Sequence, residues 1–162
     1  MRTNSLLLSA FISSVMAVVP AASAAAVGAK CVTGKPTAAS YTWNFQKEAD
    51  RIFEDIHADA AQAQYHAEQL QSFGLDEEVS WQSHAIELSE VRSAINDMGE
   101  RLCRLEVIRR VVAPWQQKTI DRIAVTVRLM ADNAEDAIAF GNNNPRTLWS
   151  PTFRKYTSNL CS

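Results

Sequence analysis

Three long segments of this chain repeat an apolar residue at every third or fourth position. They cover residues 42–73, 77–111 and 114–141, and the breaks between them are short. This spacing places the apolar side chains of a segment on one face of an α-helix. Pro114 suits the first turn of a helix, and Gly74 stands where a left-handed C-cap often ends one. The sequence therefore predicts three long amphipathic helices.

The rest of the chain adds one short helical segment. Residues 142–145 read Asn-Asn-Asn-Pro, which breaks a helix, and Pro151 can open a helix over residues 151–159. Helices joined by short connections pack antiparallel. We therefore expect an all-α fold, an antiparallel up-down-up bundle of three long helices plus a short C-terminal helical segment. The tail carries four large apolar residues that we expect to cover one side of the core: Leu148, Trp149, Phe153 and Tyr156.

The apolar face of the first segment is rich in alanine. Ala49, Ala60, Ala63 and Ala67 lie on it, at helical spacing. Small side chains let two helices approach closely, as in a tight coiled coil, because side-chain size sets the distance between helix axes. Such a face also suits self-association, so the sequence favours a homodimer or a protein partner.

The first 24 residues have the pattern of an export signal. After a weakly positive start, an apolar run covers residues 6–19, and Ala22-Ser23-Ala24 fits the small residues that signal peptidase requires. The run is too short to cross ~30 Å of hydrocarbon, which disfavours the alternative of an uncleaved anchor. We therefore predict a signal peptide (1–24), a flexible leader (25–40) and a helical-bundle domain (41–162), with the mature protein periplasmic or secreted.

Charge and motifs argue against several classes of function. The 162 residues carry a formal net charge of −2, which disfavours a generally basic nucleic-acid binder. The sequence has no P-loop, no dinucleotide-binding fingerprint and no nucleophile elbow. Glu54 and His57 form one Glu-x-x-His motif, whereas a di-iron bundle needs two. We therefore expect no enzymatic activity and no resident cofactor or metal.

The three cysteines allow at most one internal disulfide. Cys31, Cys103 and Cys161 match no zinc or redox motif, and no Cys-x-x-Cys-His is present to attach haem covalently. Outside the cytoplasm a disulfide can form and persist. In an up-down-up bundle Cys31 and Cys103 fall near the same end, which favours their pairing narrowly over a Cys31–Cys161 pair. Three unpaired thiols are the remaining alternative.

Two sets of side chains are candidates to hold a metal ion or haem iron. His84 occupies a seam position of the second segment, and His66 of the first segment falls at a similar height. Further along the bundle, His57, Met98 and Met130 also share a height, and a His/Met pair is a known way to hold haem iron. A histidine satisfied by a hydrogen bond and methionines that fill the core explain the same positions more simply.

Basic and aromatic residues gather where the second segment meets the third. The basic residues suit the negative end of the helix dipole, and a second interpretation is a binding site for an acidic surface or an anionic lipid. Trp115 stands at the start of the third segment, where we expect it to staple the turn to the bundle. The basic residues are Arg101, Arg104, Arg109 and Arg110.

Four stretches of the chain resemble a family of small exported bacterial helical proteins that has no characterised activity. The stretches are residues 41–45, 80–85, 95–99 and 113–123. The resemblance extends over residues 41–153. It implies an exported α-helical protein and adds no catalytic residue.

These observations favour an exported, non-enzymatic helical bundle that binds another protein or itself. Two alternatives remain open. One is a haem- or metal-binding bundle that uses the histidines and methionines named above. The other is a periplasmic holdase that shields unfolded chains.

Overall fold

The computed structural model describes residues 44–161, which form four α-helices and no strand. The helices are α1 (Phe45–Phe73), α2 (Trp81–Ile108), α3 (Pro114–Asn143) and α4 (Pro151–Asn159), and a 3-10 turn, η1 (Arg109–Val111), follows α2. The expected all-α architecture of three long helices and a short C-terminal one is confirmed. The predicted signal peptide and leader, together with Cys31, lie outside the described residues.

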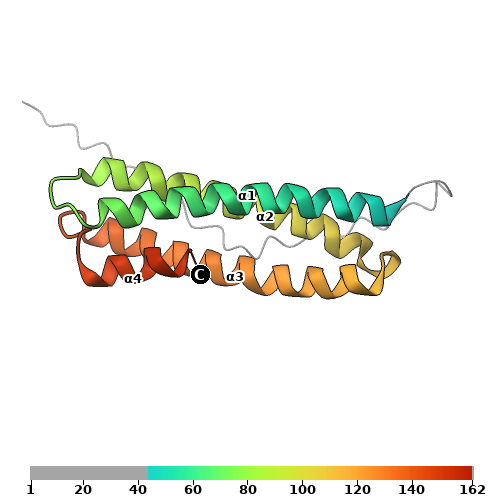
Figure 1. Cartoon of the computed structure of the whole chain (residues 1–162). Coiled ribbons are helices and arrows are strands. Elements are labelled where there is room, and N and C mark those ends of the chain that lie inside the picture. Colours follow the sequence, from blue (N-terminus) through green and yellow to red (C-terminus); the bar gives the residue numbers. More distant parts are fainter. Residues whose placement is uncertain (1–43, 162) are drawn as a thin grey trace, which may run out of the picture.

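The three long helices run up, down and up along an elongated bundle (Figure 1). α1 and α2 pack against each other along their length, and α3 returns against α2. α4 then reverses direction and packs against both α3 and α1 over one half of the bundle. We call this half the α4 end, and it also contains the α1–α2 connection.

Polar residues cap the starts of three helices. The side chains of Asn44, Ser80 and Ser150 each accept a hydrogen bond from the backbone N–H three residues later. This satisfies one of the N–H groups that the first turn of a helix leaves unpaired. Pro114 and Pro151 occupy the first turns of α3 and α4, where a missing N–H costs nothing.

Gly74 ends α1, but in a different conformation from the one expected. Its φ and ψ angles of −67° and −3° are right-handed, so the predicted left-handed C-cap is wrong. The backbone N–H of Gly74 instead donates to the carbonyl oxygen of Leu70 at 2.9 Å. A Cβ atom at this position would lie 3.1 Å from Cγ of Arg154. The small residue therefore makes room for α4.

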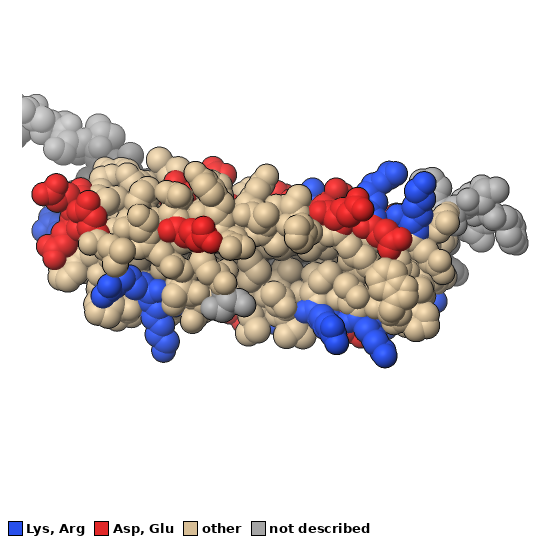
Figure 2. Space-filling model, in the orientation of Figure 1, with Lys and Arg blue, Asp and Glu red and all other residues tan. Residues whose placement is uncertain are grey.

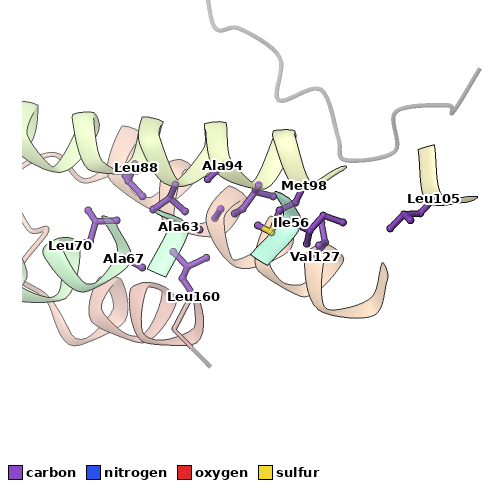
Figure 3. Packing of buried hydrophobic residues seen from close by; sticks show 14 of the residues in the cluster. Ile56, Ala63, Ala67, Leu70, Leu88, Ala94, Met98, Leu105, Val127 and Leu160 are labelled. Atoms are coloured by element: carbon purple, nitrogen blue, oxygen red, sulfur yellow. The ribbon is translucent and has the colours of Figure 1, made fainter. Parts of the chain in front are cut away.

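The core consists of one row of apolar side chains along the bundle axis. Ala49, Ala63 and Ala67 of α1 are at most 1% exposed, so the alanine-rich stripe faces the other helices. Figure 3 shows Ala63 and Ala67 in the same row as Leu88, Ala94 and Met98 of α2, with Val127 of α3 and Leu160 near the C-terminus completing it. None of the described helices is both long enough and apolar enough to span a membrane.

The C-terminal segment is docked on the bundle as predicted, except that Trp149, one of the four residues expected to cover the core, is 41% exposed. Phe153 and Thr157 are fully buried, and Leu160 is nearly so. The amide Nε2 of Gln71 in α1 lies 3.1 Å from Sγ of Cys161, and Nδ2 of Asn159 donates to Oδ1 of Asn133 in α3. These contacts hold α4 between α1 and α3.

Candidate functional site

His84 lies at the centre of an aromatic cluster at the α4 end. Its side chain is 1% exposed, and its ring packs edge-on against Phe73 and Phe153 at centroid distances of 5.7 and 5.6 Å. Nδ1 lies 3.0 Å from the carbonyl oxygen of Ser80. A carbonyl oxygen only accepts, so Nδ1 carries the proton and a neutral ring leaves a lone pair on Nε2. Nε2 is buried and has no hydrogen-bond partner.

A pocket of about 150 Å³ opens beside this ring, between α2 and the end of α3. Its walls are mostly apolar, and Arg92 is the one charged side chain among the described residues that line it. Nε2 of His84 has almost no accessible surface. A molecule in the pocket therefore reaches that nitrogen only after the side chain moves. The lining residues include Trp81, His84, Leu88, Arg92, Ile138 and Leu148.

This environment predicts that His84 acts as a core residue. Replacing His84 by leucine is expected to change the free energy of unfolding by less than about 1 kcal/mol. The change removes one unpaired nitrogen and keeps most of the volume, and the Ser80 oxygen, which loses Nδ1, still accepts from the backbone N–H of residue 84. His84→Ala, which leaves a cavity, is expected to cost about 2–4 kcal/mol. Urea denaturation of the two variants compares them. Equal losses would mean that the ring makes a polar contact that the protein needs.

The other histidine proposed as a partner of His84 has a different neighbour. Nδ1 of His66 lies 2.6 Å from Oε2 of Glu87 across the α1–α2 interface. The structure therefore pairs His66 with a carboxylate, while His84 bonds to the backbone of its own helix. Within residues 44–161 there is no group of three or more His, Cys, Asp or Glu side chains placed to hold a metal ion.

The second candidate set does not come together as a ligand pair. His57 is exposed, whereas Met98 is 1% exposed in the core. Met130 is half-buried and packs against the same core. Because Ile56, its neighbour in sequence, takes the inward position, His57 points off the seam. The two methionines serve as packing residues.

The four arginines of the second segment do not form a free basic surface. Nη1 of Arg101 lies 2.7 Å from Asp59, Nη2 of Arg104 lies 2.6 Å from Glu48, and Arg109 makes a bidentate contact with Asp121. Three of the four arginines therefore already face a carboxylate of the bundle, which weakens the interpretation as a site for acidic partners. Each of these three arginines forms an ion pair with a carboxylate of another element, and the sequence did not predict these pairs.

Asp59 is a buried carboxylate that the sequence analysis did not single out. It is 7% exposed in α1 and faces Arg101, although the 2.7 Å contact is not aligned as a hydrogen bond. Burial raises the pKa of Asp59 above its usual value, Arg101 lowers it, and the nearby Asp97 and Asp55 raise it further. The net effect raises the pKa of Asp59, so folding disfavours its charged form.

Asp59→Asn is therefore expected to stabilise the protein at neutral pH. A raised folded-state pKa means that the carboxyl favours folding most below about pH 4, its unfolded value, and loses this contribution as the pH rises through the folded-state pKa. The variant should match wild type in acid and exceed it increasingly up to neutral pH. Denaturation curves over a pH series measure this difference. A variant that is less stable than wild type at neutral pH would show that the ion pair with Arg101 dominates.

The cysteines of the described part have different states. Cys103 is bonded in a disulfide, Cys161 carries a free thiol, and no disulfide joins these two residues. The free thiol of Cys161 argues against the alternative Cys31–Cys161 disulfide. Burial, and to a lesser extent Glu68, raises the pKa of Cys161, which lowers the fraction of reactive thiolate.

Trp115 stays largely exposed, at 58%, and packs against Phe53 of α1 with ring centroids 6.3 Å apart. This contact with α1 is the one expected of a residue that staples the turn to the bundle, although most of the ring stays exposed. The neighbouring Gln116 also ties the turn to the bundle. It is 1% exposed, and its amide Nε2 donates to the backbone oxygen of Gln46 and to Asp50.

The outer surface of α3 carries a second candidate site, on the side of the helix away from the core. Val125 and Leu129 stand one turn apart there and are 60% and 57% exposed. Charged residues precede and follow them at the same helical spacing, and all are exposed. In Figure 2, basic side chains along the lower edge of the visible face lie over α3 and α4. We call this set the α3 stripe: Lys118, Arg122, Val125, Leu129, Asp132 and Asp136.

Comparisons of the chain with protein families, with curated proteins and with solved structures find no match. Its function is therefore argued from the geometry of these two sites.

Proposed function

We propose that this chain is an exported, non-enzymatic protein that acts by binding protein surfaces, its own included. The observation that carries the proposal is the pair Val125 and Leu129. Single exposed apolar residues are common on protein surfaces. Two that adjoin on the outward face of a helix, each more than half exposed, form a patch that another protein can cover.

Export is supported by the signal pattern of residues 1–24 and by the bonded state of Cys103, because disulfides persist mainly outside the cytoplasm. The chain has three cysteines and the thiol of Cys161 is free, so we infer that Cys31 is the partner of Cys103. Peptide mapping without reduction tests this pairing. A linked peptide pair that contains Cys161 would contradict it.

The two alternative functions have weaker support. Binding of haem or a metal ion through His84 requires a nitrogen that is now buried, and His66 is engaged by Glu87. Shielding of unfolded chains requires a continuous apolar cradle. The apolar pocket beside His84, at about 150 Å³, is closer to the size of a small molecule than to that of a chain segment.

The proposal predicts that a double change of Val125→Ser and Leu129→Ser abolishes association. Both side chains are exposed, so the free energy of unfolding of the monomer should change by less than about 0.5 kcal/mol for each substitution. Sedimentation equilibrium from micromolar to millimolar concentration measures the association of wild type and variant.

Ile86→Ser supplies the matched control, because Ile86 is 61% exposed but lies on α2. We expect this variant to associate as wild type does. Equal association of the double variant and wild type would remove the α3 surface from the proposal.

A further inference from the structure

We infer that two copies of the chain pair through the α3 stripe in antiparallel orientation, about a two-fold axis that passes at the level of Val127. This inference rests on the proposed function and specifies its partner and register. The six residues of the stripe follow one another at steps of four, three, four, three and four. That spacing is the seam along which two helices pack in a coiled coil.

The order of residues along the stripe is complementary to its own reverse. It begins with two basic residues, Lys118 and Arg122, and ends with two acidic ones. The apolar pair stands between them. The six positions are symmetric about position 127. When two such helices run in opposite directions with this position aligned, every basic residue of one copy therefore faces an acidic residue of the other. The pairs are Lys118 with Asp136, Arg122 with Asp132, and Val125 with Leu129.

Orientation follows from these charges. A parallel pair of helices in register would place Lys118 against Lys118 and Asp136 against Asp136, and like charges that face each other are unfavourable. In the antiparallel pair, two Val125–Leu129 contacts form the centre and four ion pairs form the rim. A two-fold axis uses the same surface on both subunits, as most homodimers do.

The charges of the stripe are available for such pairing. Among the described residues, the salt bridges involve His66, Arg101, Arg104 and Arg109 with their acidic partners, and none includes a residue of the stripe. Arg109, which is near the start of α3, is occupied by Asp121. No charged side chain of the stripe is therefore engaged in a salt bridge within residues 44–161.

Charge exchange tests the register. Lys118→Asp with Arg122→Asp makes both members of all four facing pairs acidic, and Asp132→Lys with Asp136→Lys makes both members of all four pairs basic. Each half-exchange is expected to weaken dimerisation by at least about tenfold in Kd. The full exchange of all four residues restores opposite charges in every facing pair between the two copies and leaves the net charge unchanged. It is expected to dimerise within about threefold of wild type.

The matched control changes the net charge equally on another helix. Lys47→Asp with Arg51→Asp alters two exposed basic residues one turn apart on α1 and is expected to leave dimerisation unchanged. Circular dichroism confirms that each variant is folded. A full exchange that stays monomeric, or half-exchanges that dimerise like wild type, would overturn the antiparallel register.

The outcomes also separate this inference from the proposed function. If Val125→Ser with Leu129→Ser abolishes dimerisation while the charge exchanges have no effect, association through α3 stands and the register is wrong. If wild type is monomeric at all concentrations and the double variant binds partners equally well, the proposed function itself fails.

Discussion

Replacing Phe153 by alanine is expected to lower the free energy of unfolding by about 3–5 kcal/mol, as for other fully buried aromatic residues. Phe153 is 0% exposed, and its ring packs against His84 of α2 and Phe140 of α3. It is therefore the side chain through which α4 holds the other helices together. A helix of nine residues such as α4 is not stable without tertiary contacts. We therefore expect α4 to detach from the bundle and unfold in this variant.

Urea denaturation and hydrogen exchange measure these two effects. The amides of α4 should lose their protection in Phe153→Ala, while those in the opposite half of α1 and α2 keep theirs. Trp149→Ala is the control, because Trp149 is 41% exposed at the same end, and we expect a loss below about 1 kcal/mol. Unchanged protection of α4 in Phe153→Ala would show that other contacts suffice to dock it.

Replacing Gln116 by alanine is expected to cost about 2–4 kcal/mol, because the change removes buried hydrogen bonds and leaves a cavity. Its amide donates at 2.9 Å to the backbone oxygen of Gln46 and at 2.7 Å to Oδ1 of Asp50. Its oxygen accepts at 2.9 Å from the N–H of Ala113. One buried side chain thus fixes the start of α3 to the start of α1.

Thermal or urea denaturation compares the loss of stability in Gln116→Ala with that in a control variant, Gln64→Ala. Gln64 is an exposed glutamine whose amide bonds only to Glu68 of its own helix, so its loss should cost less than about 0.5 kcal/mol. If the two variants lost equal stability, the contacts of Gln116 would not contribute to holding α1 and α3 together.

The helices and their order could be predicted because apolar periodicity and helix-end residues are local properties of the sequence. The predicted segment 151–159 coincides with α4, and the predicted third segment ends two residues before α3 does. Gln116 carried a usable signal as well, since it stands four residues before Ile120 on the same helical face. Extending the buried apolar face of the third segment back by one turn would have placed this glutamine in the core.

The partners of charged residues could not be predicted in the same way. Whether Arg101 meets solvent or Asp59 depends on how α1 and α2 are rotated about their axes, and spacing within one helix does not determine this rotation. The same holds for His66, whose partner is Glu87 of α2 rather than His84. The α3 stripe was missed because apolar periodicity directs attention to the buried face of a helix, whereas this surface is the opposite one.

Native mass spectrometry of the protein exported from its own host tests the central claim, self-association of an exported chain, most directly. We predict a mass equal to residues 25–162 less two hydrogens, together with a species of twice that mass whose share rises with protein concentration. A spectrum that contains only the single-chain mass at every concentration would contradict the claim.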